Sequence, residues 1–282
     1  MSFAFLPTRR FIRIGGEAAS DFLQNLITTD LESLGENEAR AGALLTPQGK
    51  ILFDFLVSRE GTAYRLETSA EQQEALLRRL TMYKLRAAVD LKAEDPEGVS
   101  VHWDKAAPDG SVTDGRFAKA GVTLYRVPGK SAEGDVSAYD ALRIANGIAE
   151  SGSDYALQDA FPHDVLMDVN DGVSFKKGCF VGQEVVSRMK HRGTARRRVV
   201  IVSAASALPP SGTEIMASGK SMGALGTVIG DNGLAIIRID RAAEAMGSGK
   251  VMTAGDVEVS VALPGWSGIS FPAVDSLAGA ED

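Results

Sequence analysis

The sequence predicts an α+β protein that ends in a small all-β domain. Through the first half, stretches with the alternation of strands and stretches with the period of helices follow one another, which is typical of a mixed domain. From residue 197 onward, short runs of Val, Ile and Ala are separated by Gly, Pro, Asp and Asn, which favours a barrel or sandwich. Between the two patterns lies a basic segment, residues 174–198, with the only cysteine, Cys179.

The chain begins with a predicted strand, a helix and a hairpin. Residues 8–14 alternate as a strand, and residues 17–27 follow as a helix with one apolar face. Residues 39–59 are expected to form a hairpin, because a Pro and a Gly two positions later favour a turn. The second hairpin strand carries Asp54 in its middle, so this carboxylate is paired, protonated or facing a cavity, unless that face of the strand is solvated.

The remaining elements before residue 197 follow from the same patterns. Further strands are expected at residues 62–68, 86–92 and 98–103, and further helices at residues 70–84, 138–147 and 183–191. The helix at 70–84 has an acidic start and a basic end, which suits the helix dipole. Residues 104–136 are rich in Gly, Asp and Pro, so only short strands are expected there.

These elements predict a chain of four parts. Residues 1–104 form an N-terminal mixed subdomain to which residues 138–195 contribute. Residues 105–195 form a middle α/β subdomain that carries the cysteine motif. Residues 196–272 form the C-terminal β-barrel, and residues 273–282 a flexible tail, because they are small and acidic.

Net charge and cysteine content limit the partners and the cellular compartment that we expect for the protein. The formal net charge of −7 argues against a general nucleic-acid binder, and no apolar run approaches the ~20 residues that a membrane helix needs. We therefore expect no direct nucleic-acid or membrane partner. One cysteine excludes an internal disulfide and, with no apolar leader after the arginines of residues 9–13, predicts a reducing, cytoplasmic setting.

The sequence does not match the familiar catalytic and metal-binding motifs. Residues 219–223 fit the Gly-x-Ser-x-Gly pattern of serine hydrolases, but they lie in a glycine-rich turn between strands, where a strand-to-helix elbow is required. The three histidines are scattered, and with one cysteine they make no metal-ligand spacing. No metal is expected to be bound by the chain itself.

The surroundings of Cys179 leave two interpretations open. Lys176 and Lys177 precede the thiol and a helix follows it, and positive neighbours favour the reactive thiolate. Gly178 and Gly182 let the backbone turn sharply and approach a ligand. The alternative is that the cysteine is a small buried filler and that the charges lie on a solvated face.

The segment Lys177-Gly178-Cys179-Phe180-Val181-Gly182-Gln183-Glu184, followed by Arg188, closely resembles the signature of the YgfZ family. These are folate-binding proteins that assist iron–sulfur cluster assembly and repair. Residues 22–30, 45–51 and 142–148 resemble further elements of the family, so the resemblance covers nearly the whole chain. Because the family is similar in fold to the aminomethyltransferase (T-protein) of the glycine cleavage system, the resemblance implies a T-protein-like α+β fold, with three subdomains in a ring around a central channel.

The resemblance also implies a function. The chain would bind tetrahydrofolate or another folate, and would assist iron–sulfur client enzymes or assembly proteins, with a link to tRNA modification. Cys179 would be a reactive thiol beside the folate channel, and Lys177 would help to lower its pKa. The residues implied to bind folate are Asp54, Arg143, Gln183 and Glu184.

Two other functions remain open at this point. One is a folate-dependent aminomethyl or one-carbon transferase of the T-protein type, so whether the chain is an enzyme is undecided. The related enzymes usually carry paired acidic residues where this chain has Phe53 and Asp54. The other is a docking protein without a ligand. If the shared-channel interpretation is right, Asp54, Arg143 and Cys179 should converge on one cavity.

Overall fold

The structure, a computed structural model, describes residues 2–95, 97–130 and 134–273. Most of the expected flexible tail, from residue 274 on, lies outside the described residues. The chain divides into two compact units, the first comprising Met1–Tyr139 and Met167–Ser187 and the second Asp140–Leu166 and Arg188–Asp282. Whether the first unit divides further near residue 104 stays a prediction.

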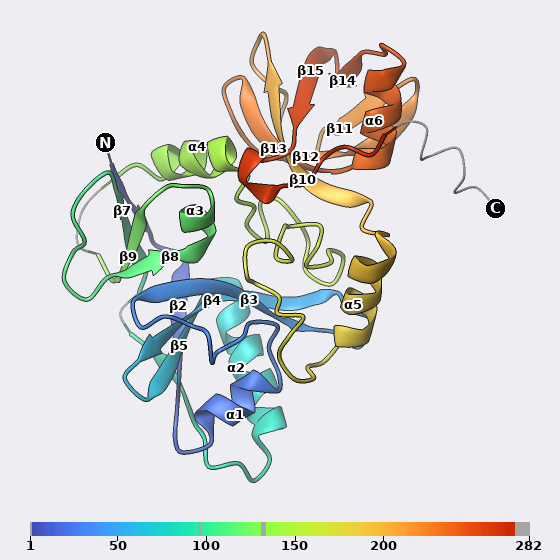
Figure 1. The fold of residues 1–282 in the computed structure, drawn as a ribbon. Helices are drawn as coiled ribbons and strands as arrows, with labels where there is room; N and C mark the ends of the chain where they lie inside the picture. The colour runs from blue at the N-terminus through green and yellow to red at the C-terminus, as the bar shows by residue number, and fades with distance from the viewer. Residues whose placement is uncertain (1, 96, 131–133, 274–282) are drawn as a thin grey trace. The chain divides into compact units, whose positions relative to one another are not determined.

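A nine-stranded sheet forms the frame of the first unit (Figure 1). In spatial order its strands are β1 (Phe3–Leu6), β7 (Val99–Trp103), β9 (Leu124–Pro128), β8 (Val112–Asp114), β3 (Glu38–Leu45), β4 (Ile51–Glu60), β5 (Ala63–Ser69), β2 (Arg9–Gly15) and β6 (Asp90–Glu94). Neighbouring strands are antiparallel, except that β3 and β8 are parallel.

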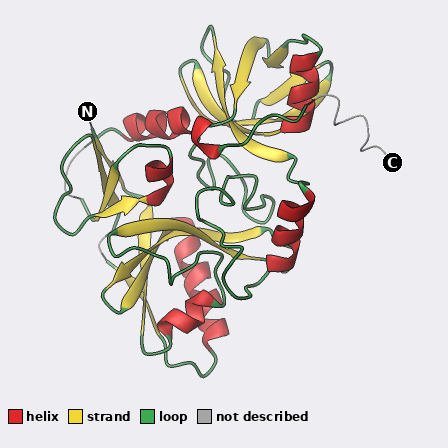
Figure 2. Ribbon diagram, in the orientation of Figure 1, coloured by secondary structure: helices red, strands yellow, loops and turns green. Residues whose placement is uncertain are grey.

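Two helices, α1 (Ala19–Gln24) and α2 (Ala70–Lys84), pack on one face of this sheet (Figure 2). Their buried side chains, such as Leu23 and Leu76, join Ile12 and Phe55 from the strands in one apolar core. This packing confirms the helix predicted at residues 70–84, whereas the predicted first helix is shorter than expected. No helix of the described residues is long and apolar enough to cross a membrane.

Two short features of the first unit, a hairpin turn and a short helix, contact residues of the candidate site. The predicted hairpin is confirmed: β3 and β4 pair with Ala43 opposite Asp54, and the backbone N–H of Thr46 donates to the carbonyl of Lys50 at 2.8 Å across the turn. The stretch expected to hold only short strands also contains a helix, α3 (Gly115–Lys119). It forms because the carboxylate of Asp114 caps its first turn, accepting the backbone N–H of Arg116.

The second unit contains a closed six-stranded barrel. Its strands, in spatial order, are β10 (Arg197–Ala204), β13 (Asn232–Arg238), β12 (Lys220–Ile229), β11 (Glu214–Ala217), β14 (Met252–Ala254) and β15 (Val257–Ala262). The predicted C-terminal barrel is thus confirmed. One element was missed, helix α6 (Ile239–Gly247), which buries the small side chains of Ala242 and Ala245 against the barrel core. A short 3-10 helix, η1 (Gly265–Ser267), follows the barrel.

Two helices cross the division between the units. The boundaries fall within α4 (Val136–Asn146) and within α5 (Gln183–Arg192). The cysteine motif leads into α5, and its residues up to Ser187 belong to the first unit. The candidate folate-binding arginine, Arg143, lies on the part of α4 that belongs to the second unit.

Candidate functional site

The loop before Cys179 rests on the segment that follows α1. Thr28 is fully buried, and its hydroxyl donates to the carbonyl of Gly172 at 2.6 Å while accepting the backbone N–H of Ala43, in β3, at 2.9 Å. The backbone N–H of Ser174 donates to the carbonyl of Thr28 at 2.9 Å. One threonine therefore joins three parts of the chain that are far apart in sequence, and so fixes where the cysteine loop begins.

Lys177 ties the same loop to the same segment. Its ammonium donates to the carbonyls of Ile27 at 2.7 Å and Thr29 at 2.8 Å, and it lies 5.4 Å from the ring centroid of Phe180. Burial lowers the pKa of Lys177 to about 8, although the charge of Asp30 acts in the opposite direction. The amine therefore loses its proton near neutral pH more readily than an ordinary lysine does.

Asp30 follows directly after the two carbonyls that Lys177 contacts. Sequence reasoning did not single it out. Burial raises the pKa of its carboxyl group, but hydrogen bonds from Gln24 and from the backbone of Glu32, with the charge of Lys177, bring that pKa below its usual value. The amide of Gln24 donates to Oδ1 of Asp30 at 2.9 Å. Asp30 belongs to the segment that carries the family resemblance, but a polar run after a helix looks like an ordinary turn.

The thiol of Cys179 is exposed, so the interpretation of this residue as a buried filler is wrong. The next side chain, Phe180, is buried and anchors the loop. Gly182 then has a φ of +79°, and a Cβ there would lie 2.6 Å from the carbonyl oxygen of Thr46 in the hairpin turn. The thiol is thus held at the surface between two fixed points, Lys177 on one side and Gly182 on the other.

Gln183 and Glu184 lie directly after this turn, in the first turn of α5. A carboxylate at this end of a helix is favoured by the helix dipole. Val186 is fully buried, and Val185 lies next to Gly49 of the hairpin turn, so the start of α5 is anchored to the first unit. Four of the six predicted site residues therefore come from one continuous segment. Their contact with folate stays a prediction.

Asp54 is half-buried on β4 and is paired by Gln72. The side-chain amide of Gln72 donates to Oδ1 of Asp54 at 2.8 Å, and its oxygen accepts the backbone N–H of Asp54 at 3.1 Å. The hydroxyl of Thr68 donates to the carbonyl of Asp54 at 2.9 Å. Of the situations expected for this carboxylate, pairing is therefore observed, with a neutral amide as the partner.

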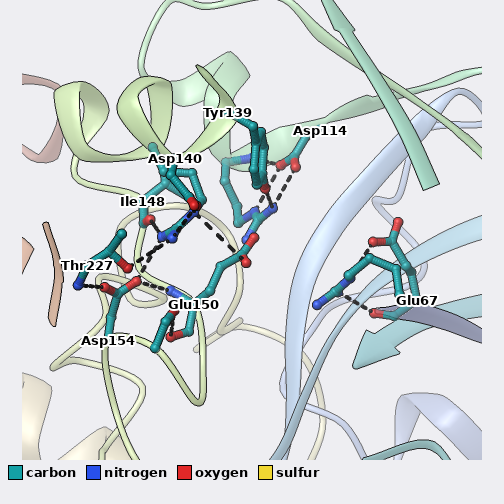
Figure 3. Close-up of polar contacts among 12 residues, drawn as sticks. Glu67, Asp114, Tyr139, Asp140, Ile148, Glu150, Asp154 and Thr227 are labelled. Atoms are coloured by element: carbon teal, nitrogen blue, oxygen red, sulfur yellow. Dashed lines mark hydrogen bonds and ion pairs between the residues drawn. The ribbon is translucent and has the colours of Figure 1, made fainter. Parts of the chain in front are cut away.

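A buried cluster of charges lies in the same unit (Figure 3). The guanidinium of Arg126 donates through Nε to Glu67 Oε2 at 2.8 Å and through Nη1 to Asp114 Oδ2 at 3.1 Å. Arg9 also donates to Glu67, at 2.7 Å, and Arg116 to Asp114, at 2.7 Å. We call these five residues the buried charge cluster. Sequence reasoning missed it, because its members come from four different strands and from helix α3.

The opposite charges of this cluster stabilise one another. Burial raises the pKa of Glu67, but the charges of Arg126 and Arg9 outweigh it and hold that pKa below its usual value. Beside the cluster is a pocket of about 330 Å³, lined by Glu67 and Arg126 and by apolar side chains such as Phe11, Leu56 and Val112. Polar and charged side chains, among them Arg59, Glu60 and Arg65, line it as well, so the pocket wall is mixed in character.

Arg143 lies in the second unit, where its guanidinium is fully engaged. Its partners Asp140, Asp154 and Thr227 are labelled in Figure 3. Nε and Nη2 donate to Asp140, Nη1 donates to the carbonyl of Ile148 and to Asp154 at 2.8 Å, and Nη2 also donates to Thr227 of β12 at 3.1 Å. All five N–H groups of this guanidinium thus have an acceptor within the unit. A folate carboxylate at Arg143 would have to replace one of these acceptors, and its binding there stays a prediction.

The predicted site residues are therefore divided between the units. Lys177, Cys179 and Asp54 belong to the first unit, and Arg143 belongs to the second. The expected convergence of Asp54, Arg143 and Cys179 on one cavity stays a prediction.

Comparison with known proteins identifies the family. A model of the C-terminal β-barrel domain of CAF17 matches residues 196–269. An iron–sulfur cluster assembly factor IBA57 homologue of Pyricularia oryzae is 31% identical over 222 residues, which cover 70% of this chain and 56% of the relative. The homologue of Aspergillus fumigatus is 30% identical over 315 residues, which cover 84% of this chain and 70% of the relative. The chain belongs to the IBA57 family.

The IBA57 relatives qualify the resemblance to YgfZ. They are relatives of that family and are named as iron–sulfur cluster assembly factors. The chain spans about half the length of the first of these IBA57 homologues, 56% and 55% in two fungal species. Folate binding and tRNA modification do not follow from their names.

The fold of this IBA57 family member has a solved counterpart. The glycine cleavage system aminomethyltransferase T from Bartonella henselae superposes with a TM-score of 0.69, covering 93% of this chain and 85% of that chain, at 16% sequence identity. The predicted T-protein-like α+β fold is therefore confirmed. At this identity the likeness concerns the fold and not the reaction.

One prediction is wrong. The single cysteine indicated a cytoplasmic setting, but the IBA57 homologues that the chain resembles are named as mitochondrial proteins. The reason for the error is that an unpaired cysteine indicates a reducing environment without specifying which compartment provides it.

Proposed function

We propose that this chain takes part in the assembly of iron–sulfur clusters and that the thiol of Cys179 is the group that acts. Membership of the IBA57 family carries the first part of the proposal. The second part is supported by the exposed thiol, which is held between the Lys177 tether and the Gly182 turn. A thiol that is accessible and yet fixed in position is suited to meeting a cluster or a partner's sulfur, since the thiolate is the ligand and nucleophile form.

Complementation tests this function. Cells that lack their own protein of this family would be given the full chain or an empty vector, and the activity of an iron–sulfur enzyme would be measured in extracts. The activity of an iron-free enzyme in the same extract serves as the control. We expect the chain to restore the first activity and leave the second unchanged. Equal iron–sulfur enzyme activity with chain and vector would refute the proposal.

We also propose that the chain binds tetrahydrofolate, with Asp54 as the partner of the pterin. A carboxylate can accept two hydrogen bonds from an amino-pyrimidine edge. The pairing of Asp54 with Gln72 supports this assignment, because it holds the carboxylate in a fixed orientation through one oxygen. Gln183 and Glu184 are proposed as further contacts. The engagement of Arg143 within its own unit fits a folate-holding role less well.

Calorimetric titration with tetrahydrofolate tests the ligand separately from the cellular function. We expect saturable binding by the full chain and weaker binding by Asp54→Asn, which keeps the shape of the side chain but loses the second acceptor oxygen. Arg143→Lys is the matched comparison, since Arg143 is the alternative anchor. If Asp54→Asn binds as the unmodified chain does, Asp54 is not the pterin partner. If the unmodified chain shows no heat of binding, the folate proposal fails.

A folate-dependent one-carbon transferase is the second candidate that the sequence left open. The fold is that of an aminomethyltransferase, but a fold hosts many reactions, and the paired acidic residues of those enzymes are here Phe53 and Asp54. Release of a one-carbon unit from an aminomethyl donor to tetrahydrofolate by the purified chain would establish that activity.

A further inference from the structure

Two large apolar side chains at the end of helix α2 are exposed to solvent. Met82 is 62% exposed and Leu85 is 87% exposed. Residues 78–86, which we call the α2 knob, read Arg-Arg-Leu-Thr-Met-Tyr-Lys-Leu-Arg. Single exposed hydrophobic residues are common on protein surfaces and by themselves mean little. Two further properties distinguish this segment, one of the backbone and one of the charge.

The backbone at Leu85 is strained. Leu85 is the residue that ends α2, and it has a φ of +48° and a ψ of −107°. Bulky residues rarely adopt a positive φ, and glycine is the residue that most readily takes such a conformation. The chain instead keeps a large apolar side chain, with 87% of its surface in water, at a position where glycine would be less strained. Such strain is characteristic of residues retained for function.

The charge of the knob is opposite to that of the chain. Residues 78–86 contain four cations and no carboxylate, whereas the whole chain has a formal net charge of −7. Within the helix, Arg78 pairs with Glu74 in an exposed ion pair, and Arg79, Lys84 and Arg86 add further positive charge. The field of an acidic chain repels nucleic acids and anionic membranes at long range. A local cationic surface is better suited to a limited acidic patch on another protein.

We propose that the α2 knob is a docking site for a protein partner whose surface offers an apolar socket ringed by Asp and Glu side chains. Leu85 fills the socket, Met82 packs beside it, and the arginines and lysine meet the carboxylates. Protein interfaces commonly have an apolar centre and a polar rim. The docking site contains no residue of the cysteine loop, so the proposal goes beyond the function proposed above and does not depend on it.

Photo-crosslinking in cells tests the proposal. A benzophenone amino acid replaces Met82 in the full chain, and Ala75, which is exposed on the same helix, is the control position. We expect a protein adduct at position 82 that is absent at position 75, with the partner's cross-linked peptide carrying Asp or Glu beside apolar residues. Equal adducts at both positions, adducts with RNA or lipid only, or a contact peptide without carboxylates would overturn the proposal.

Two variants make the test independent of a folding defect. Leu85→Gly removes the side chain and relieves the strained backbone, so we expect a higher melting temperature together with a cross-link yield at least about tenfold lower, as for loss of a hot-spot residue. Arg86→Glu keeps Leu85 and reverses one charge, and we expect a reduced cross-link yield. An unchanged cross-link yield in Leu85→Gly would show that the residue is only a poor helix cap, and would overturn the proposal.

Discussion

At the scale of single residues, Lys177 has a positioning role in addition to the role expected from the sequence. The sequence suggested that its charge lowers the pKa of the neighbouring thiol. The structure directs the ammonium to two backbone carbonyls, of Ile27 and Thr29, where it holds the cysteine loop in place. The effect of Lys177 on the reactivity of Cys179 stays a prediction, but its effect on the position of the loop follows from these contacts.

The pKa of Lys177 predicts a pH dependence of stability. Burial lowers this pKa from 10.5 to about 8, so between these values the unfolded chain binds more protons than the folded chain does. The free energy of unfolding therefore rises with pH across this window. Across this window we expect the free energy of unfolding of the unmodified chain to rise by about 1–2 kcal/mol more than that of Lys177→Met. The rise is smaller than the full pKa difference would give, because solvent screens a partly exposed charge. Urea titrations at pH 7.5 and pH 10.5, read by fluorescence, measure this difference, and parallel pH profiles of the two proteins would contradict the assignment.

Two glycines of the cysteine motif should respond differently to alanine. Gly182 has a positive φ and no room for a Cβ beside the carbonyl of Thr46, whereas a Cβ on Gly178 meets open space. We expect Gly182→Ala to lower the free energy of unfolding by about 2–3 kcal/mol and Gly178→Ala to change it by less than about 0.5 kcal/mol. Chemical denaturation of both variants measures this contrast. Similar losses would mean that the loop is not pinned at Gly182.

At the scale of elements, the buried charge cluster connects strands of the sheet that are distant in sequence. Arg126 of β9 and Glu67 of β5 are 59 residues apart, and Arg126 also reaches Asp114 at the end of β8. Glu67, Asp114 and Arg126 are buried, so each depends on its partners for the interactions that water would otherwise supply. The cluster therefore holds the strands beside the pocket in register through interactions that no short stretch of sequence reveals.

Breaking this cluster should cost much more than breaking a surface pair. Glu67→Gln leaves the charge of Arg126 poorly compensated in the interior, so we expect a loss of about 3–5 kcal/mol. Arg78→Ala, at the exposed pair with Glu74, should cost less than about 0.5 kcal/mol. Because the folded pKa of Glu67 lies below its unfolded value of 4.5, its stabilisation is present above that pH and is lost as the pH falls further. Urea denaturation at pH 7 and at pH 3.5 measures these losses and their pH dependence. Equal losses of the free energy of unfolding in Glu67→Gln and Arg78→Ala would contradict the account of the cluster.

The elements themselves were predictable where local pattern decides them. The helix at residues 70–84 and the hairpin around the Thr46 turn follow from periodicity and turn chemistry. Helix α6 was missed because a short alanine-rich run between strands resembles a connection. The partners of Arg143 could not be read from the sequence, since they include Thr227, 84 residues away. Local patterns predict elements, whereas pairings between distant residues need the fold.

At the scale of the whole molecule, the two units contain different parts of the predicted site. The first unit holds the cysteine loop and Asp54, and the second holds Arg143. Arg143 joins α4 to strand β12 through Thr227, and Asp154 strengthens the same link by accepting the backbone N–H of Thr227 at 2.7 Å. Within its unit, this arginine thus organises the packing of the helix end on the barrel.

This arrangement predicts the outcome of replacing Arg143. Arg143→Met should destabilise the second unit by about 3–5 kcal/mol, because Asp154 is left buried without its charged partner. We expect hydrogen exchange to increase in β12 and the end of α4 while the core around Leu23 stays protected. Lost tetrahydrofolate binding with unchanged exchange would instead assign Arg143 to the ligand.

The central claim is that the exposed thiol of Cys179 carries the function of the chain in iron–sulfur cluster assembly. The most direct measurement is the activity of an iron–sulfur enzyme in cells that lack their own family member and carry Cys179→Ser, with Lys176→Gln as the neighbouring control. Because Cys179 is exposed, the serine variant should keep the melting temperature of the unmodified chain. We expect Lys176→Gln to restore the enzyme activity and Cys179→Ser to restore little of it. Full restoration by Cys179→Ser would contradict the account.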